Sequence, residues 1–387
     1  MAPKILVSAG EASGDLYAAS LVSVLRRDLP RADFFGCAGP RMRAAGVRPV
    51  VDAASLSVVG LVEVVRHIPR IYMEFRRMVA TAREERPDLA ILTDSPDFHL
   101  RLAARLKSFG IPVVYLVAPQ VWAWRKGRIG RIRCNIDRLL CIFPFEEDFF
   151  RNQGVSADYI GHPLARLVKP VASREEFLSR HALRRDRPLV CLLPGSRRGE
   201  ALRHLPALLD AVARLDLTGA AGFVLALPAG FWQDGGAILR QRVGSLPVKV
   251  VEGQTWDAIA YSEVALAASG TVTIEAALLG TPMVTFYRVS GLSWLLGKSL
   301  VDVPFYSMVN LVAGRRVVPE LIQNEMSGER LAAETLRLLG DAAARQRMRQ
   351  DLSEVAAKLA GASDPMERAA KIVAQLLRMD RGVTHVA

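Results

Sequence analysis

A short segment rich in glycine and carboxylates, residues 10–15, reads Gly-Glu-Ala-Ser-Gly-Asp and follows an apolar run at the start of the chain. Its glycines permit a tight turn and a close approach of the backbone to a ligand. The carboxylates of Glu11 and Asp15 flank Ser13, an arrangement that suits the binding of a substrate hydroxyl. The spacing differs from the Gly-x-Gly-x-x-Gly dinucleotide fingerprint, which disfavours NAD and FAD. A helix-capping turn, with Ser13 or Asp15 as the cap, is the alternative interpretation.

A second segment, residues 94–99, reads Asp-Ser-Pro-Asp-Phe-His and follows the apolar run 90–93. General base chemistry needs one carboxylate with access to a hydroxyl group and a second group that orients it. Asp94 and Asp97 are therefore candidate catalytic residues. The alternative is a helix start, with Pro96 near its first position and Asp97 in its first turn, and it explains Asp97 better than Asp94.

A third segment, residues 119–126, combines tryptophan with basic residues and reads Pro-Gln-Val-Trp-Ala-Trp-Arg-Lys. Trp122 and Arg125 suit contact with a sugar or a phosphate. A nucleic-acid-binding protein would use the same residues for base stacking and phosphate contact. The remaining alternative is a tryptophan packed under a solvated basic helix.

Two later segments predict anion sites at strand ends, namely residues 194–200 and 268–275. Backbone amides, a helix N-terminus and Arg197 can bind an anion in the first. Small residues, Ser-Gly-Thr at 269–271, leave room for a phosphate in the second. Glu275 could hold a ribose diol there, or it could simply complement the helix dipole. The chain has no Asp-x-Asp pair and no His-Glu-x-x-His motif, so we expect no catalytic metal.

These segments need elements to position them, and the sequence predicts alternating strands and helices. The expected strands are 4–9, 90–93, 113–117, 139–142, 159–160, 189–193, 223–226, 248–251, 264–267 and 283–286, with helices over 16–27, 100–109 and 201–214 among them. Continuous apolar strands between amphipathic helices indicate parallel sheets covered on both faces. We therefore predict an α/β fold with two doubly wound halves, joined by a polar connection over about 163–187 with one short helix, and ending in helices from 328 to 379.

The composition sets broad limits on function. Of 387 residues, 51% are hydrophobic and 23% are charged, which excludes wholesale disorder. The formal net charge of +12 attracts anions in general, whether nucleic acid, phosphorylated small molecules or an anionic membrane surface. No window predicts a transmembrane helix or a signal peptide. The four cysteines lack Cys-x-x-Cys spacing, and we expect reduced core thiols in a cytoplasmic protein.

Two stretches mix large apolar residues with basic ones, residues 58–79 and 292–306. This mixture suits anionic lipid headgroups with acyl chains beside them. Two ordinary core helices are the alternative. The residues predicted to contact membrane or acyl chains are Val59, Leu61, Val62, Ile68, Ile71, Tyr72, Phe75 and Trp294.

Taken together, these segments resemble the lipid-A-disaccharide synthase family of Gram-negative bacteria. The matching pieces appear in family order over nearly the whole chain and lie at 10–15, 38–42, 94–98, 121–125, 160–163, 193–197, 268–271 and 310–315. The resemblance implies an inverting glycosyltransferase of GT-B architecture, in which two Rossmann-like domains face across a cleft. It implies an acceptor-binding domain over 1–165 and a UDP-sugar-binding domain over 166–365. The remaining residues, 366–387, are expected to form a helix and tail that pack back on the N-terminal domain.

The resemblance also implies a reaction between two substrates. The donor would be UDP-2,3-diacylglucosamine and the acceptor 2,3-diacylglucosamine 1-phosphate, giving the β-1,6-linked lipid A disaccharide 1-phosphate and UDP without a metal or other cofactor. Asp94 would be the general base for the acceptor 6-hydroxyl, with Asp97 as the fallback. Glu11 and Ser13 would line the acceptor side. The resemblance places UDP at Arg197, Ser269, Gly270, Thr271 and Glu275, and completes the cleft with Asn310 and Arg315.

The sequence is also compatible with other functions. The nearest is another UDP-sugar enzyme of the same architecture, similar to a UDP-N-acetylglucosamine 2-epimerase or a peptidoglycan glycosyltransferase. A nucleic-acid-binding protein that uses the basic residues 125–133 belongs to a different class, but it leaves the two carboxylate segments unexplained. We expect no nucleic-acid partner, a possible homodimer, and a cytoplasmic protein associated peripherally with the inner membrane.

Overall fold

The computed structural model describes residues 2–56, 61–231, 241, 243–244, 246–291, 294 and 303–383, and for 61–67 and 379–383 it describes the helical backbone alone. The chain forms two compact units. Unit 1 runs from the N-terminus to Pro163 and resumes at Leu359, and unit 2 runs from Leu164 to Lys358. The units therefore divide after residues 163 and 358, whereas the sequence predicts domain boundaries after residues 165 and 365.

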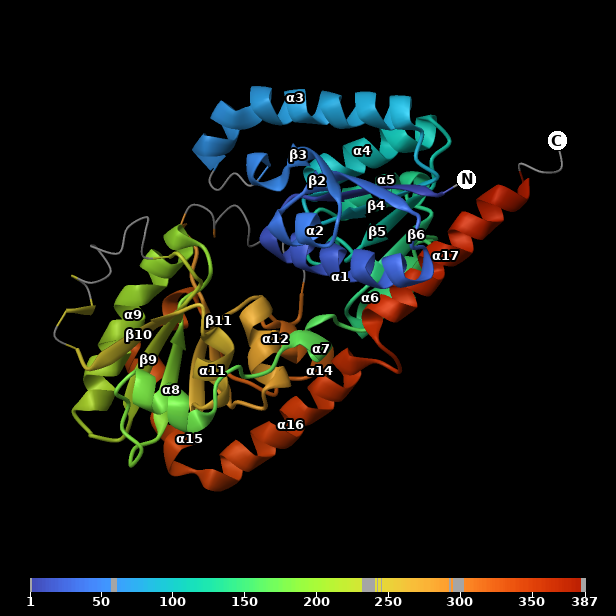
Figure 1. The fold of residues 1–387 in the computed structure, drawn as a ribbon. Helices are drawn as coiled ribbons and strands as arrows, with labels where there is room; N and C mark the ends of the chain where they lie inside the picture. Colours follow the sequence, from blue (N-terminus) through green and yellow to red (C-terminus); the bar gives the residue numbers. More distant parts are fainter. Residues whose placement is uncertain are drawn as a thin grey trace. The chain divides into compact units, whose positions relative to one another are not determined.

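Unit 1 is a seven-stranded parallel sheet in the order β3-β2-β1-β4-β5-β6-β7. Figure 1 shows α3 and α4 on one side of this sheet and α1 and α17 on the other. The strand β4 is buried along its whole length, as continuous apolar runs in parallel sheets are. The strands are β1 (Lys4–Ala9), β2 (Asp33–Ala38), β3 (Arg48–Asp52), β4 (Leu89–Thr93), β5 (Val113–Leu116), β6 (Arg138–Cys141) and β7 (Ala157–Tyr159). The helices are α1 (Ala12–Asp28), α2 (Pro40–Ala44), α3 (Leu61–Glu85), α4 (Pro96–Ser108), α5 (Ile129–Asn135), α6 (Pro144–Arg151) and α17 (Pro365–Val383).

Unit 2 is a six-stranded parallel sheet in the order β10-β9-β8-β11-β12-β13. The central strands β8 and β11 are buried throughout. Its strands are β8 (Leu189–Leu193), β9 (Gly222–Leu227), β10 (Val248–Glu252), β11 (Val264–Ala268), β12 (Met283–Tyr287) and β13 (Glu320–Ile322). Its helices are α7 (Leu164–Leu167), α8 (Arg174–Arg180), α9 (Arg198–Asp216), α11 (Thr255–Ala260), α12 (Thr271–Leu278), α14 (Met308–Ala313), α15 (Gly328–Gly340) and α16 (Ala342–Ala360), which ends just inside unit 1.

The predicted α/β class and both parallel sheets are confirmed, and the structure adds three strands to the predicted set. These are β2, the edge strand β3 and the three-residue strand β13. The predicted single helix in the connection 163–187 is wrong, because α7 and α8 both lie there. The prediction of four core thiols is wrong for Cys134, which is exposed on α5, whereas Cys37, Cys141 and Cys191 are buried and free.

Both sheets reverse their strand order at one point. In unit 1 the chain turns outward in opposite directions from the neighbouring strands β1 and β4, and in unit 2 from β8 and β11. Ligands of doubly wound sheets bind outside the carboxyl ends of the strands at this switch point. The segments 10–15 and 94–99 follow β1 and β4, and the segments 194–200 and 268–275 follow β8 and β11. The four segments with candidate chemistry therefore lie at the two switch points.

The C-terminal helix α17 returns to unit 1 and packs against α1, where Glu367 forms an ion pair with Arg27 (Figure 1). Among the residues that the structure describes, no helix is both long enough and apolar enough to cross a bilayer.

Asp15 links two elements of unit 1 inside the core. Its carboxylate is 3% exposed and accepts hydrogen bonds from the amides of Gly39 (3.0 Å), Arg41 (2.9 Å) and Met42 (3.1 Å) at the start of α2. An added Cβ at Gly39 would lie 2.5 Å from the Asp15 carboxyl carbon, so glycine is needed at this contact. The structure therefore places Asp15, a predicted substrate-binding residue, as a cap for α2.

Replacing Asp15 with alanine should destabilise unit 1 by about 2–3 kcal/mol, because three amides would lose a charged acceptor in the core. The measurement is hydrogen exchange, by mass spectrometry, of peptides from β1, β2 and α2. The matched control is Asp28→Ala, which removes an exposed carboxylate from the same helix. Equal protection in the two variants would contradict the assigned role.

Candidate active site

Two loops meet at the switch point of unit 1. The carboxylate of Asp94, directly after β4, accepts hydrogen bonds from the backbone amides of Gly10 (2.8 Å) and Glu11 (3.0 Å), directly after β1. An added Cβ at Gly14 would lie 1.7 Å from Oδ2 of Asp94, and one at Gly10 would lie 2.4 Å from Oγ of Ser95. The glycines of the segment 10–15 are thus required because the second loop packs directly on the first.

The Asp94 carboxyl group lies in a largely desolvated position. Its side chain is 12% exposed, and burial raises its pKa to about 7 although the amides of Gly10 and Glu11 act in the opposite direction. A carboxyl group that titrates near neutral pH is suited to accept a proton in a general base step. The side chains of Glu11 and Ser13 are exposed beside it.

Asp97 lies in a different environment, one turn further along. Its side chain is 75% exposed and forms ion pairs with Arg125 (3.1 Å) and Arg128. The Arg125 guanidinium lies 4.3 Å from the centre of the Trp124 ring. The loops after β4 and β5 therefore present a carboxylate, two guanidinium groups and an exposed indole together.

Trp122 does not share that surface. Its side chain is buried, and its Nε1 donates to Oε1 of Glu146 over 3.0 Å. The structure thus places Trp122, a predicted substrate-binding residue, in the core. The exposed ring belongs to Trp124, two residues later. In the sequence, Arg128 is only one of several basic residues in 125–133. No sequence signal predicts its ion pair with Asp97.

In unit 2, the loop after β8 leads into the N-terminus of α9. Gly195 has a φ of +118°, a conformation that favours glycine, and Arg197 is the N-cap residue. Arg197 is exposed, and among the described residues no acidic side chain pairs with it. The buried ring of His204 joins this loop to the end of β12, because its Nδ1 bonds to the Pro194 carbonyl (2.7 Å) and its Nε2 accepts from the Arg288 amide (3.0 Å). An unpaired guanidinium at a helix N-terminus can bind an anion.

The neighbouring loop after β11 presents small residues at the N-terminus of α12. Gly270 is the N-cap residue, and an added Cβ there would meet no atom within 4 Å. Ser269 donates through Oγ to the Tyr306 carbonyl (2.5 Å), and Thr271 is exposed. Burial raises the pKa of Glu275, one turn into α12, to about 7, while a hydrogen bond from Trp256 lowers it. This open helix N-terminus also suits an anionic group.

Asn310 and Arg315 are not placed as ligand contacts. Asn310 is fully buried, and its amide binds the backbone of Val317 and Val318 and the carboxylate of Glu320. Glu320 in turn accepts from the amides of Tyr306 and Ser307, beside Ser269. Asn310 therefore supports the loop that contacts Ser269.

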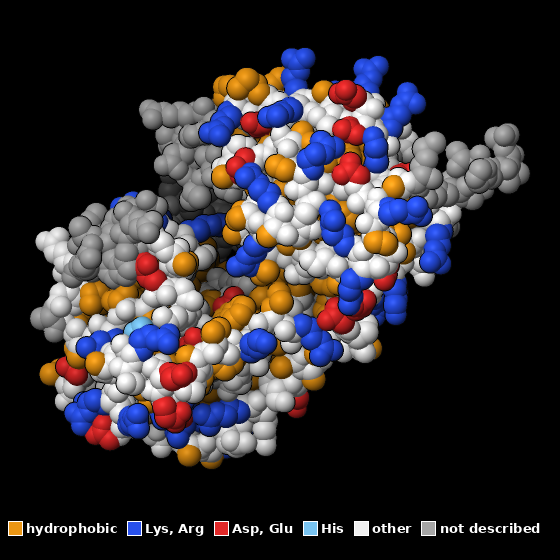
Figure 2. Space-filling view, viewed as in Figure 1, with side chains coloured by type: hydrophobic (Ala, Val, Ile, Leu, Met, Phe, Trp, Pro, Cys, Tyr) orange, Lys and Arg blue, Asp and Glu red, His pale blue; other side chains and the backbone are white. Residues whose placement is uncertain are grey.

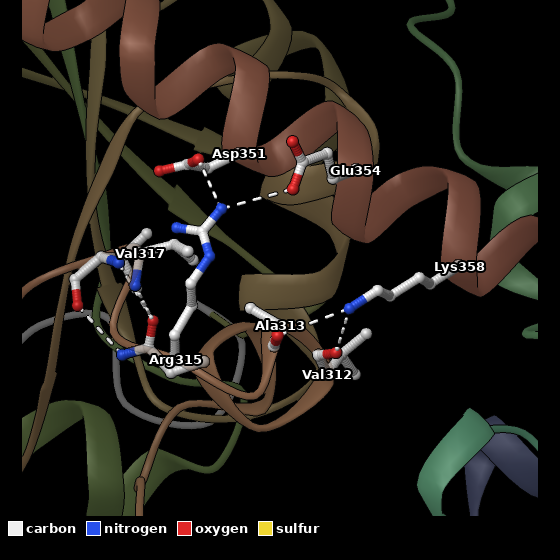
Figure 3. A network of polar contacts seen from close by, with 9 residues as sticks. Val312, Ala313, Arg315, Val317, Asp351, Glu354 and Lys358 are labelled. Atoms are coloured by element: carbon white, nitrogen blue, oxygen red, sulfur yellow. Dashed lines mark hydrogen bonds and ion pairs between the residues drawn. The ribbon is translucent and has the colours of Figure 1, made fainter.

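Arg315 extends toward α16 and pairs with Asp351 (2.8 Å) and Glu354 (3.3 Å), as Figure 3 shows. From the same helix, Lys358 reaches the carbonyls of Val312 and Ala313 at the end of α14. These contacts fasten α16 to the α14 segment and occupy the Arg315 guanidinium.

The first of the two predicted membrane-contact stretches is described only in part. Val59 lies outside the described residues, as do the side chains of Leu61 and Val62. Ile68 and Tyr72 are 52% and 60% exposed on α3, Ile71 and Phe75 are half-buried, and Phe75 packs on Phe98. In the second stretch, Trp294 is half-buried, and its ring lies 6.1 Å from that of Tyr306.

A groove of about 640 Å³ lies between α3 and the end of α4, lined by Tyr72, Phe75, Arg76, Arg83, Arg105 and Phe109 among others. Glu84 also lines the groove, but within the described part of the chain no acidic side chain forms an ion pair with its three arginines. Figure 2 shows Lys and Arg side chains along the edge of unit 1 that α3 forms. This surface of unit 1 is therefore both apolar and basic. Within the described residues, no group of His, Cys, Asp and Glu side chains has the arrangement of a metal site.

Comparison with known proteins identifies relatives over the whole chain. The model of the family described as lipid-A-disaccharide synthetase matches residues 5–374. A lipid-A-disaccharide synthase from Solibacter usitatus is 63% identical over 385 residues and covers 100% of both chains. One from Myxococcus xanthus is 45% identical and covers 97% of this chain and 98% of its own length.

Solved structures of low identity share the fold. A UDP-GlcNAc 2-epimerase from Neisseria meningitidis, bound to UDP-GlcNAc, matches with a TM-score of 0.65 at 12% identity, over 97% of this chain and 100% of its own. The Anabaena protein HepE, in complex with UDP and glucose, matches with a TM-score of 0.59 at 15% identity, over 96% of this chain and 100% of its own. These two similarities show the fold alone. The activity is inferred instead from the lipid-A-disaccharide synthases, whose sequence identity to this chain is higher.

Proposed function

The chain belongs to the lipid-A-disaccharide synthase family, and on that premise we propose that it joins UDP-2,3-diacylglucosamine to 2,3-diacylglucosamine 1-phosphate. It is a glycosyltransferase of lipid A biosynthesis with the GT-B fold. The epimerase-like alternative is not favoured, because its support is a shared fold at 12% identity, against 63% for a lipid-A-disaccharide synthase. The observation that carries the assignment of the site is the Asp94 carboxyl group, held at the switch point of unit 1.

In the proposed reaction, Asp94 is the general base. Its carboxylate takes the proton of the acceptor 6-hydroxyl while that oxygen attacks the anomeric carbon of the donor. The bond from this carbon to the diphosphate oxygen breaks, UDP leaves with the bonding electrons, and the configuration inverts. Asp94 suits this step better than Asp97, because its pKa is raised to about 7 and its carboxylate is oriented by two amides. Asp97 is already committed to two guanidinium groups.

Unit 2 carries the groups proposed to hold UDP. The unpaired guanidinium of Arg197 and the open N-terminus of α12 at Gly270 and Thr271 would balance the charge of the leaving diphosphate. Ser269 shapes this loop through its bond to the Tyr306 carbonyl. Glu275 is proposed to hold the ribose hydroxyls. Because these groups supply positive charge themselves, we propose that the transfer is independent of a metal.

Unit 1 carries the groups proposed to hold the acceptor. Glu11 and Ser13 are exposed beside Asp94 and can bind sugar hydroxyls. Arg125, stacked on Trp124, can bind an anionic or sugar group of the same substrate. Asp15 and Trp122 are left out of this set because their polar groups have partners in the core.

The acylated substrates require a lipid surface, and we propose that α3 contacts it. Ile68, Tyr72 and Met73 are exposed on this helix, next to the arginines of the groove. Apolar side chains among basic ones bind the boundary of an anionic membrane. The protein would then act at the cytoplasmic face of the inner membrane as a peripheral protein.

The test of this function is UDP release in mild detergent, with the donor and the acceptor supplied separately and together. We expect release only with both, together with a disaccharide phosphate detected by mass spectrometry. Asp94→Asn should lower kcat by about two to four orders of magnitude, the usual effect of losing a general base, and should leave UDP binding intact. Asp97→Asn is the matched control and should retain far more activity. Release from the donor alone, or an Asp94→Asn enzyme that turns over normally, would refute the proposal.

Membrane contact through α3 is testable without substrates. The double variant Ile68→Ser with Tyr72→Ser should bind vesicles containing anionic phospholipid about tenfold or more weakly than the parent, because two apolar anchors are lost. The control replaces Val171 and Leu217 by serine, since these are exposed apolar residues of unit 2. Binding in a flotation assay should also weaken with salt. Equal flotation of the two double variants would contradict the assigned surface.

A further inference from the structure

The backbone that carries Asp94 adopts an uncommon conformation. Asp94 has a φ of 55° and Ser95 a φ of 36°, so two consecutive residues with side chains are left-handed. Left-handed residues that carry side chains are unfavourable and persist only where their surroundings determine them. The conformation ends β4, and the next residue, Pro96, begins α4.

Two buried side chains fix this turn from the core side. The Asp94 carbonyl oxygen accepts a hydrogen bond from Nδ1 of His99 (2.9 Å) and another from the hydroxyl of Tyr115. His99 and Tyr115 are both fully buried. A buried carbonyl with two side-chain donors is tightly constrained, because breaking either contact leaves a polar group without its partner in the core.

The sheet register places these donors. Leu92 of β4 pairs with Ser8 of β1 on one side and with Tyr115 of β5 on the other. Neighbours in register point to the same face of a parallel sheet, here the face that α4 covers. His99, in the first turn of α4, therefore lies above this row, and its Nε2 is 2.8 Å from Oγ of Ser8.

This geometry defines the protonation state of the imidazole. A carbonyl oxygen can only accept, so Nδ1 of His99 carries the proton. Burial lowers the pKa of His99 to about 4, so the ring is neutral at pH 7 and Nε2 accepts from the Ser8 hydroxyl. The Asp94 carbonyl thus fixes the tautomer of His99, and the Ser8 hydroxyl supplies a partner for the other ring nitrogen.

We infer that His99 and Tyr115 are positioning residues for the transfer reaction: by holding the carbonyl of Asp94 they keep its backbone left-handed and its carboxylate against the amides of Gly10 and Glu11. The inference rests on the proposed role of Asp94 as the base. With either donor removed, the turn can relax and the carboxylate can swing away from the two amides toward water. The amides of Gly10 and Glu11 would then lose their acceptor, whereas the groups proposed to hold UDP belong to unit 2.

The experiment compares Tyr115→Phe, His99→Leu and the parent enzyme. Each change removes one hydrogen-bond donor, and we expect kcat to fall about tenfold while KM for the UDP-sugar stays unchanged. His99→Asn is the conservative variant, since its amide can donate from the position of Nδ1, and it should restore most of the lost turnover. Tyr261→Phe is the matched control, because Tyr261 donates in the same way to the Ala172 carbonyl of unit 2.

A second readout does not depend on turnover. Carboxyl ¹³C NMR of aspartate-labelled protein, with the Asp94 signal assigned by its loss in Asp94→Asn, gives the titration of that group. In Tyr115→Phe the pKa of Asp94 should fall from about 7 toward its ordinary value, because burial raises it in the parent and the released carboxylate is solvated. Parent-like titration and kcat in folded Tyr115→Phe would overturn the inference. Normal turnover of Asp94→Asn would instead remove the proposed base, and the titration alone would then decide whether the two side chains position it.

Discussion

The architecture of the unit 1 site depends on one close contact, the carboxylate of Asp94 seated on the amides of Gly10 and Glu11. This contact joins the ends of two neighbouring strands at the point where the strand order reverses. It leaves no room for a side chain at Gly14, and it requires a left-handed turn after β4. Burial at this position raises the pKa of the Asp94 carboxyl group to about 7, although the two amides themselves lower it, so the group can accept a proton at neutral pH. The need for glycine at position 14, the left-handed turn and the raised pKa of Asp94 therefore all follow from the close packing of these two loops.

In the proposed reaction, the two units divide the chemistry of an inverting transfer. Unit 1 carries the carboxylates, with Asp94 protected from water and Glu11 exposed beside it. Unit 2 carries the unpaired guanidinium of Arg197 and the open N-terminus of α12, which are groups that favour negative charge. A single displacement needs a base for the attacking hydroxyl and stabilisation for the leaving diphosphate. In the proposed reaction, each requirement would be met at the switch point of one sheet.

The sequence predicted the elements and loops whose signals are local. Continuous apolar runs identified most of the buried strands, although β2, buried apart from its first residue, was missed. Turn residues at strand ends located all four switch-point segments. The edge strand β3 was not predicted, because three of its five residues are exposed. Contacts between residues distant in sequence could not be predicted either. Asp15 binds residues 24 to 27 positions away, and Arg315 pairs with Asp351, 36 positions away. Polar residues in motifs can contact a ligand or the core, and the core partners of Asp15, Trp122 and Asn310 could be identified only from the fold.

The most direct test of the account is the pH dependence of UDP release with donor and acceptor both held well below KM, where the rate reports groups that titrate in the free enzyme. Asp94 acts as a base only when deprotonated, and its pKa is raised to about 7. The rate should therefore rise with pH through about 7 and level off above it, with the midpoint matching the NMR titration of Asp94 in the free enzyme. A rate that is already level from about pH 5 upward, or a midpoint that leaves the Asp94 titration unmatched, would contradict the claim that this desolvated carboxyl group takes the proton.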